Sequence, residues 1–426
     1  MKALQDNNCN RIGLHGMGGA GKTSMAKEVA CKLKDSELID KVIFLVVSKP
    51  LDFKKILGEL AKALDVDLEK VNEEELSHTI CARITHMEEK LLIILDVWEE
   101  FDLTKNLGIP SDHQHKSCNI LITTRNLRVC TELRCQTIEL QTLNDEEALG
   151  LFKAHASINK STRGLKGMPE KIVKHCGGVP VAIVAIARAL KNQPTSVWKD
   201  ALKTLEDHGV DQNLEEAYKC LKLSYDNLKH EKAKELLMIS SLFPEDYEIP
   251  IQLLIKIGIG LGSCGENDEY HFKRNEVCAA IAELIYSSLL LNGEEECVKM
   301  HDLVREVTLW IGDNDIKSIV DLKIAIKKSL RYFLWKNDDF PVEFDGEKLE
   351  VLLIFLDGSK DLEVSKNAFL KEMTKLKVLI LYCSFYKRIQ ALSLTNSLQS
   401  LKDIRTLILK NLKLGDISIL ENLLSL

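Results

Sequence analysis

The sequence predicts a multidomain chain that begins with an α/β domain built on a doubly wound parallel sheet. A helical bundle, a small α+β domain and a short repeat array are predicted to follow it. Three observations support this: apolar β-rich runs alternate with helical patterns in the first third, helical patterns dominate the middle, and a leucine motif recurs near the C-terminus. At roughly 150 residues per domain, a chain of 426 residues suggests about three domains.

Four short apolar runs predict the strands of the N-terminal sheet. Because they are almost purely apolar, they are typical of strands that are buried on both faces. They span residues 11–15, 41–48, 91–97 and 119–124. The helical patterns between them lie at residues 23–34, 53–64 and 76–88. This alternation predicts parallel pairing, in a domain that spans residues 1–143.

The middle of the chain is predicted to be a helical bundle over residues 144–212, followed by the small α+β domain over residues 213–325. The four predicted helices of the bundle lie at 145–157, 168–176, 180–191 and 196–206. Pro180 opens the third of them, as proline does at a first helical position.

Residues 326–426 carry an internal repeat. The motif L-x-x-L-x-L occurs three times there, starting at Leu349, Leu376 and Ile404. Successive starts are 27 and 28 residues apart, which lies in the range of leucine-rich repeats. We expect a truncated array, because no capping repeat is evident.

The overall composition is that of an ordinary globular protein, with 45% apolar and 28% charged residues. The net charge of −7 argues against a nucleic-acid protein that relies on a broad basic surface. No apolar run approaches the ~18 residues that span a bilayer. The 12 cysteines include no CxxC pair, which is typical of a reducing compartment. We therefore expect a cytoplasmic protein without a transmembrane segment.

A glycine-rich motif follows the first predicted strand. Residues 16–23 read GMGGAGKT and fit the phosphate-binding pattern G-x-x-x-x-G-K-[ST]. Backbone N–H groups converge on phosphate in such loops, and the helix that follows aims its N-terminal dipole at the anion. Lys22 should reach the β- and γ-phosphates, and Thr23 should bind Mg²⁺. The candidate nucleotide-binding residues are Gly16, Gly18, Gly19, Ala20, Gly21, Lys22, Thr23 and Ser24.

Asp96 follows the buried run LLIIL of the third predicted strand. The carboxyl ends of parallel strands face the ligand crevice, so Asp96 is the candidate catalytic carboxylate and, with Thr23, the candidate Mg²⁺ site. An isolated aspartate after a strand is more often a turn residue or a helix cap. The glycine-rich motif upstream and the order of the strands favour the metal role.

Six motifs occur in a fixed order along the chain. They are GMGGAGKTS (16–24), LLIILDVW (91–98), ITTR (122–125), CGGVPVA (176–182), SLFPEDYEIP (241–250) and MHD (300–302). Together they resemble the NB-ARC module of plant nucleotide-binding leucine-rich-repeat disease-resistance proteins. A tryptophan after the strand that carries Asp96, here Trp98, is similar to the pattern of the coiled-coil subclass of this family. The resemblance implies an α/β P-loop NTPase domain followed by a helical bundle, a winged-helix domain and the start of a leucine-rich-repeat solenoid.

The resemblance also implies roles for three further residues. Arg125 would be the sensor arginine that meets the γ-phosphate of ATP, and Pro180 would pack near the adenine or ribose. His301 would contact the β-phosphate of ADP from the winged-helix domain. If the resemblance is set aside, Arg125 is interpreted as a surface arginine at a strand end, Pro180 as the first residue of a helix, and His301 as a single histidine before a helix.

The chain departs from the family pattern at the strand that carries Asp96. The family usually has two adjacent acids, LDDVW, where this chain has LDVW, and the second acid is the usual candidate for positioning the attacking water. We therefore expect at most a slow P-loop ATPase. Only 15 residues precede Gly16, so we also expect the N-terminal coiled coil of the family to be absent.

The leading hypothesis is an ADP/ATP-binding switch of plant innate immunity, in which nucleotide exchange controls a closed and an open state. The repeats would sense a pathogen effector or a guarded host protein, or maintain autoinhibition, and activation would bring oligomerisation. One alternative is a conventional P-loop NTPase with real turnover, and another is a degenerate or decoy fragment. No nucleic-acid partner is expected.

Overall fold

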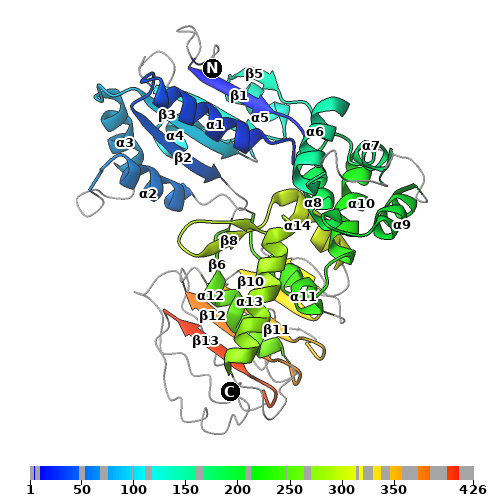
Figure 1. Ribbon diagram of the computed structural model, residues 1–426. Coiled ribbons are helices and arrows are strands. Elements are labelled where there is room, and N and C mark those ends of the chain that lie inside the picture. The colour runs from blue at the N-terminus through cyan, green and yellow to red at the C-terminus, as the bar shows by residue number, and fades with distance from the viewer. Residues whose placement is uncertain are drawn as a thin grey trace. The chain divides into compact units, whose positions relative to one another are not determined.

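The computed structural model divides into two compact units, residues 1–220 and 221–426 (Figure 1). The residues that it describes are 4, 10–47, 53–67, 75–97, 99–110, 118–158, 165, 167–206, 213–245, 247–262, 270–312, 316–319, 330–336, 346–356, 373–383 and 401–411. Within these ranges, no helix has both the length and the apolar character needed to cross a membrane.

A five-stranded parallel sheet forms the centre of the first unit. Its strand order is β2-β3-β4-β1-β5. The strands are β1 (Arg11–His15), β2 (Lys41–Val47), β3 (Leu91–Val97), β4 (Cys118–Thr124) and β5 (Gln136–Glu139). The four strands predicted from apolar runs are confirmed. The sequence did not predict β5, which is exposed along its whole length and pairs in parallel with β1 at the edge of the sheet.

Helices cover both faces of this sheet (Figure 1). On one face, α1 (Lys22–Asp35) packs its buried Ala26 and Leu33 against Leu92 and Ile94 of β3. The other face is covered by α2 (Phe53–Ala63), α3 (Leu76–Thr85), α4 (Leu103–Leu107) and α5 (Leu127–Glu132). Successive residues of the central strands therefore point alternately toward α1 and away from it.

The first unit continues into a helical bundle. Its helices are α6 (Asp145–Ala156), α7 (Met168–Lys174), α8 (Pro180–Leu190) and α9 (Thr195–Glu206), and α10 (Asn213–Asp226) runs across the boundary between the units. The first four match the predicted helices. A capping box between Asn144 and Glu147 begins α6. Pro180 is the first residue of α8, where its missing N–H leaves no hydrogen bond unmade.

The second unit begins with an α+β arrangement. Its helices are α11 (Glu231–Ser240), α12 (Ile251–Leu261), α13 (Tyr270–Tyr286) and α14 (Asp302–Ile311). The strands β6 (Ile249–Pro250), β7 (Leu291–Asn292) and β8 (Cys297–Lys299) form an antiparallel sheet in the order β6-β8-β7. Arg305 of α14 donates a hydrogen bond to the Phe243 carbonyl at 2.8 Å, which fastens this helix to the loop after α11.

A second parallel sheet contains the predicted repeats. Its order is β13-β12-β11-β10-β9, from β9 (Ile316–Ile319), β10 (Tyr332–Lys336), β11 (Val351–Leu356), β12 (Val378–Cys383) and β13 (Thr406–Lys410). The three leucine motifs coincide with β11, β12 and β13. Their first residues, Leu349, Leu376 and Ile404, are fully buried in one core. The identification of these units as leucine-rich repeats stays a prediction.

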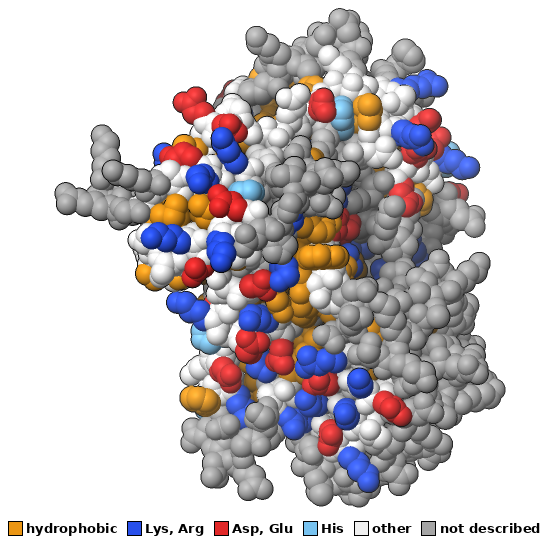
Figure 2. Space-filling view, turned by 90° about the vertical axis from the view of Figure 1, so that its right-hand side faces the viewer, with side chains coloured by type: hydrophobic (Ala, Val, Ile, Leu, Met, Phe, Trp, Pro, Cys, Tyr) orange, Lys and Arg blue, Asp and Glu red, His pale blue; other side chains and the backbone are white. Residues whose placement is uncertain are grey.

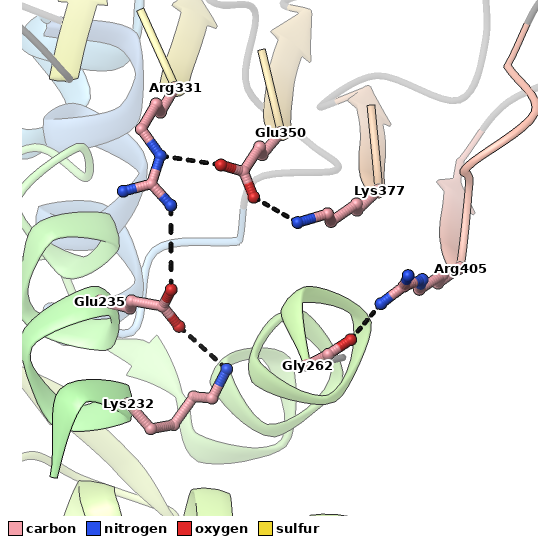
Figure 3. Close-up of polar contacts among 7 residues, drawn as sticks. All are labelled: Lys232, Glu235, Gly262, Arg331, Glu350, Lys377 and Arg405. Atoms are coloured by element: carbon pink, nitrogen blue, oxygen red, sulfur yellow. Dashed lines mark hydrogen bonds and ion pairs between the residues drawn. The ribbon is translucent and has the colours of Figure 1, made fainter. Parts of the chain in front are cut away.

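Charged side chains precede four strands of the second sheet, and we call Arg331, Glu350, Lys377 and Arg405 the charged row (Figure 3). Glu350 accepts hydrogen bonds from Arg331 Nε at 2.7 Å and from Lys377 Nζ at 2.6 Å. Arg405 donates to the carbonyl of Gly262, which follows α12. Burial alone would raise the pKa of the Glu350 carboxyl, but the hydrogen bonds and charges of Lys377 and Arg331 outweigh it and lower the pKa.

Candidate nucleotide-binding site

The glycine-rich loop connects the end of β1 to the start of α1. Gly21 precedes the helix with a φ of 96°, in the left-handed region that favours glycine. The first turn of α1 has no side-chain cap and no acidic residue, whereas α6 has a capping box and three acids in its first turn. No residue of this first turn therefore supplies a carboxylate to its N–H groups or to the positive end of its dipole. Such a helix N-terminus suits a phosphate group.

Lys22 lies across this loop. Its Nζ donates hydrogen bonds to the carbonyls of Gly16 at 2.9 Å and Met17 at 2.8 Å, and only 8% of the residue is exposed. Because a buried ammonium is costly unless it is hydrogen-bonded, these carbonyls hold it in the loop. Phosphate oxygens would make stronger, charge-assisted partners for the same group. Around Lys22, the predicted residues Gly18, Gly19 and Ala20 are buried, and Ser24 is exposed.

Thr23 and Asp96 meet at the carboxyl end of β3. The Thr23 hydroxyl donates a hydrogen bond to Asp96 Oδ2 at 2.9 Å, so the two predicted metal ligands are in direct contact. Hydroxyl and carboxylate oxygens are ligands that Mg²⁺ prefers. These oxygens come from the first turn of α1 and from the neighbouring strand β3, so the donor set fits a Mg²⁺–nucleotide complex.

The end of β4 brings two further side chains to this site. A Cβ placed on Gly18 would lie 2.7 Å from Arg125 Cζ, so the guanidinium group rests against the loop. Thr123 pairs in register with Asp96 and is fully buried. Thr123 was not among the residues that the sequence predicted. The signal that could have found it is the alternation in β4, where Leu121 and Thr123 share one face.

Pro180 lies where the bundle joins the sheet domain. The turn that precedes it packs closely on the segment after β5, because the Leu143 N–H donates to the Gly178 carbonyl at 2.9 Å. A Cβ on Gly178 would lie 2.3 Å from the Leu143 carbonyl oxygen, so this approach requires glycine. The proposed contact of Pro180 with the base or ribose stays a prediction.

His301 belongs to the second unit and caps α14. Its Nδ1 accepts a hydrogen bond from the Leu303 N–H at 3.1 Å. A neutral imidazole that accepts at Nδ1 carries its proton on Nε2 and can donate from there. The contact of His301 with the β-phosphate stays a prediction, and Trp98 lies outside the described residues.

Charges of both signs are interspersed on the face of the molecule in Figure 2. Among the described side chains of this face, Lys and Arg lie beside Asp and Glu rather than in a broad basic field. Nucleic-acid backbones are bound mainly through such fields.

Most of the chain is similar in sequence to known proteins. Residues 1–162 match the family model described as the NB-ARC domain. The chain is similar to a probable disease resistance protein of Arabidopsis thaliana, with 30% identity over 99% of this chain and 47% of that protein. The disease resistance proteins SUMM2 and RPS5 of Arabidopsis thaliana are each 29% identical over 86% of this chain and 44% of their own length. The chain thus covers less than half the length of these relatives.

A solved structure offers a weaker similarity. A signal transduction ATPase with numerous domains from Pyrococcus horikoshii, which has a tetratricopeptide-repeat sensor, superposes with a TM-score of 0.48 at 19% identity. The superposition covers 72% of this chain and 41% of that one. At this TM-score the similarity carries no argument about the site.

Proposed function

Since the chain contains an NB-ARC domain and is a relative of plant disease resistance proteins, we propose that it is an ADP/ATP-operated switch of plant innate immunity. ADP would favour a closed state and ATP an open one. A nucleotide can shift this equilibrium only through contacts that differ between the two states. Arg125 is proposed as the contact of the ATP state, and His301 as the contact of the ADP state.

The observation that carries the proposal is the joint placement of Lys22, Thr23 and Asp96. The ammonium lies inside a glycine-rich loop at an uncapped helix N-terminus, and the hydroxyl and carboxylate touch each other beside it. Loop amides would bind the β-phosphate, Lys22 would reach the β- and γ-phosphates, and Thr23 and Asp96 would hold Mg²⁺. The metal would neutralise part of the phosphate charge.

Turnover is proposed to be slow. Phosphoryl transfer requires charge neutralisation and an oriented water, and the LDVW sequence lacks the second acid that usually orients this water. A slowly hydrolysing protein can persist in either nucleotide state, as a switch requires. A conventional NTPase with rapid turnover is the second candidate, and its sign would be many ATP molecules hydrolysed per minute.

The remaining parts of the proposal concern partners and location. The second parallel sheet would sense a pathogen effector or a guarded host protein, or hold the closed state. Activation would be accompanied by oligomerisation. We propose the cytoplasm as the site of action, in keeping with cysteines that are scattered along the sequence and include no CxxC pair.

The test is to purify the protein, denature it and identify the released nucleotide by chromatography. ADP at near-equal stoichiometry would support the switch. A protein that releases no nucleotide and also fails to bind added ADP would refute it and indicate a degenerate or decoy fragment. The hydrolysis rate of the same preparation separates the switch from the conventional NTPase.

A further inference from the structure

The hydroxyl of Thr123 is a buried polar group for which the described residues provide no hydrogen-bond partner. The residue is 0% exposed, and its Oγ1 makes no hydrogen bond to any part of the chain that the structure describes. Leaving a buried hydroxyl unpaired is unfavourable, and most such groups in native proteins are paired. Its position therefore needs a reason beyond packing, since valine would fill the same space without the penalty.

Strand register places this hydroxyl beside the candidate metal ligands. Thr123 pairs with Asp96 of β3 on one side and with Leu14 of β1 on the other. Paired residues of parallel strands project to the same face, and here that face is covered by α1, because Leu14 and Leu121 belong to the core beneath that helix. The Thr123 side chain thus shares the face on which Asp96 contacts Thr23.

The neighbouring residue Thr124 provides an internal contrast. It is also buried, but it points to the opposite face of the sheet. Its hydroxyl accepts a hydrogen bond from the Asn126 N–H at 3.2 Å, in the turn that precedes α5. One threonine of this strand end therefore completes a turn, and the other carries an unpaired hydroxyl toward the nucleotide site.

The same strand end carries Arg125, whose guanidinium lies against Gly18 of the loop. The carboxyl end of β4 is thus lined by a hydroxyl beside Asp96 and by a cation beside the loop. Loop amides account for the inner phosphates of a bound nucleotide, and Lys22 reaches from the β- to the γ-phosphate. A group bound between Asp96 and Arg125 would be the outermost phosphate.

We propose that the Thr123 hydroxyl donates a hydrogen bond to the terminal phosphate of a nucleoside triphosphate, a contact that a diphosphate cannot make. This inference rests on the proposed nucleotide binding. In the structure, Lys22 donates to the loop carbonyls and Thr23 donates to Asp96. Lys22 and Thr23 would turn to the phosphates and the metal of a bound Mg²⁺–triphosphate, and its terminal phosphate would be the acceptor for the Thr123 hydroxyl. Thr123 is then a residue that makes the site prefer ATP over ADP.

The test compares the affinities of Thr123→Val, Thr123→Ser and the parent for ADP and for the slowly hydrolysed analogue ATPγS, both with Mg²⁺, by calorimetry. Valine keeps the shape of threonine and removes only the hydroxyl. Thr123→Val should bind ADP like the parent and ATPγS about tenfold more weakly, the size of effect expected for one lost hydrogen bond. Thr123→Ser, which keeps the hydroxyl, should stay within about twofold of the parent for both ligands.

Thermal unfolding without nucleotide gives an independent readout, with Thr124→Val as the matched control. Replacing an unpaired buried hydroxyl by a methyl group is neutral or stabilising, so Thr123→Val should melt at or above the temperature of the parent. Thr124→Val loses a hydrogen bond and should melt lower while keeping the parent's ratio of ATPγS to ADP affinity.

Two results would overturn the inference alone. One is an unchanged affinity ratio in Thr123→Val when the parent binds both nucleotides. The other is a melting temperature of Thr123→Val that falls as far as that of Thr124→Val, because the hydroxyl would then be paired within the protein. A parent that binds neither nucleotide would refute the proposed function and this inference together.

Discussion

The two parallel sheets of this chain use polar side chains at their strand ends in opposite ways. Before the strands of the second sheet, Glu350 joins Arg331 and Lys377 through hydrogen bonds of 2.7 and 2.6 Å, so opposite charges satisfy one another. At the carboxyl ends of the strands of the first sheet, Lys22 donates to neutral carbonyls, and the Thr123 hydroxyl has no hydrogen-bond partner among the described residues. The comparison suggests a hypothesis: the charged row stabilises the second unit, and the polar groups at the strand ends of the first sheet bind the proposed nucleotide.

The largest effect is expected from removing the cation of the first site. Lys22→Ala should weaken ADP binding roughly tenfold to a hundredfold, because charge-assisted contacts contribute about 1.5–3 kcal/mol each. Calorimetry with ADP measures this. Lys32→Ala, on the exposed side of the same helix, should leave the affinity unchanged, since Lys32 pairs only weakly with Glu28. Equal ADP affinities of Lys22→Ala and the parent would contradict the proposal that the glycine-rich loop binds the nucleotide.

The second effect tests whether the charged row stabilises the fold. Glu350→Gln keeps the shape of the side chain but deprives Arg331 and Lys377 of their shared anion. With 15% of the Glu350 side chain exposed, we expect a loss of about 1–2 kcal/mol in the free energy of unfolding, measured by urea denaturation. Glu28→Gln, in the exposed pair with Lys32, is the control and should cost less than about 0.5 kcal/mol. Equal losses in the two variants would contradict a stabilising role.

Substitutions of His301 test whether a residue of the second unit also contributes to nucleotide binding. His301→Ala removes a helix cap and should cost about 1 kcal/mol of stability. His301→Asn supplies a new capping oxygen and should recover that stability. If the ring also holds ADP, both variants should release a fluorescent ADP analogue faster than the parent in stopped-flow experiments. Parent-like release from both would confine nucleotide binding to the first unit.

The smallest expected effects are changes of folding stability with pH, and the pH range of the change should differ between the two units. In the first unit, burial and the charges of Arg188 and Lys191 lower the pKa of His155 below its ordinary 6.5. As the pH falls, His155 therefore takes up a proton in the unfolded chain before it does so in the folded one. The free energy of unfolding then declines as the pH falls below 6.5. In the second unit, the pKa of Glu350 is lowered below 4.5. Its contribution is complete above 4.5 and is lost as the pH falls through the folded-state pKa.

Melting temperatures across this pH range measure both declines. His155→Gln should flatten the decline at higher pH, and Glu350→Gln should flatten the decline at lower pH. A single decline that neither substitution alters would show that the two units do not differ in this respect.

The sequence predicted the parts of the site that are local in the chain. Loop, helix start and Lys22 are contiguous, and a run such as LLIIL identifies a buried strand without knowledge of its neighbours. Thr123 was missed because its significance depends on register, which places it opposite Asp96. The charged row was missed for the same reason, since its members come together only when the strands pair.

The strand β10 was missed for a different reason. Leu330, Phe333 and Trp335 occupy the places of the three leucines of the repeat motif, and Phe333 pairs in register with Leu352 of β11. Aromatic residues thus replace leucines in the same core. The unit starts only 19 residues before Leu349, so a search at the spacing of the other repeats passes over it. A repeat is recognised from sequence only when it keeps both the L-x-x-L-x-L pattern and the spacing of the other repeats.

The close approach of Gly18 and Arg125 has a consequence for how related chains diverge. A side chain at position 18 would meet the flexible end of the arginine and push it aside, with the loop itself left intact. A substitution at position 18 would therefore move the Arg125 guanidinium away from its place beside the loop. Among relatives, glycine at the first position should accompany arginine at the second, and a lineage that loses one should soon cease to preserve the other. An alignment of many relatives would reveal this covariation between residues that are far apart in the chain.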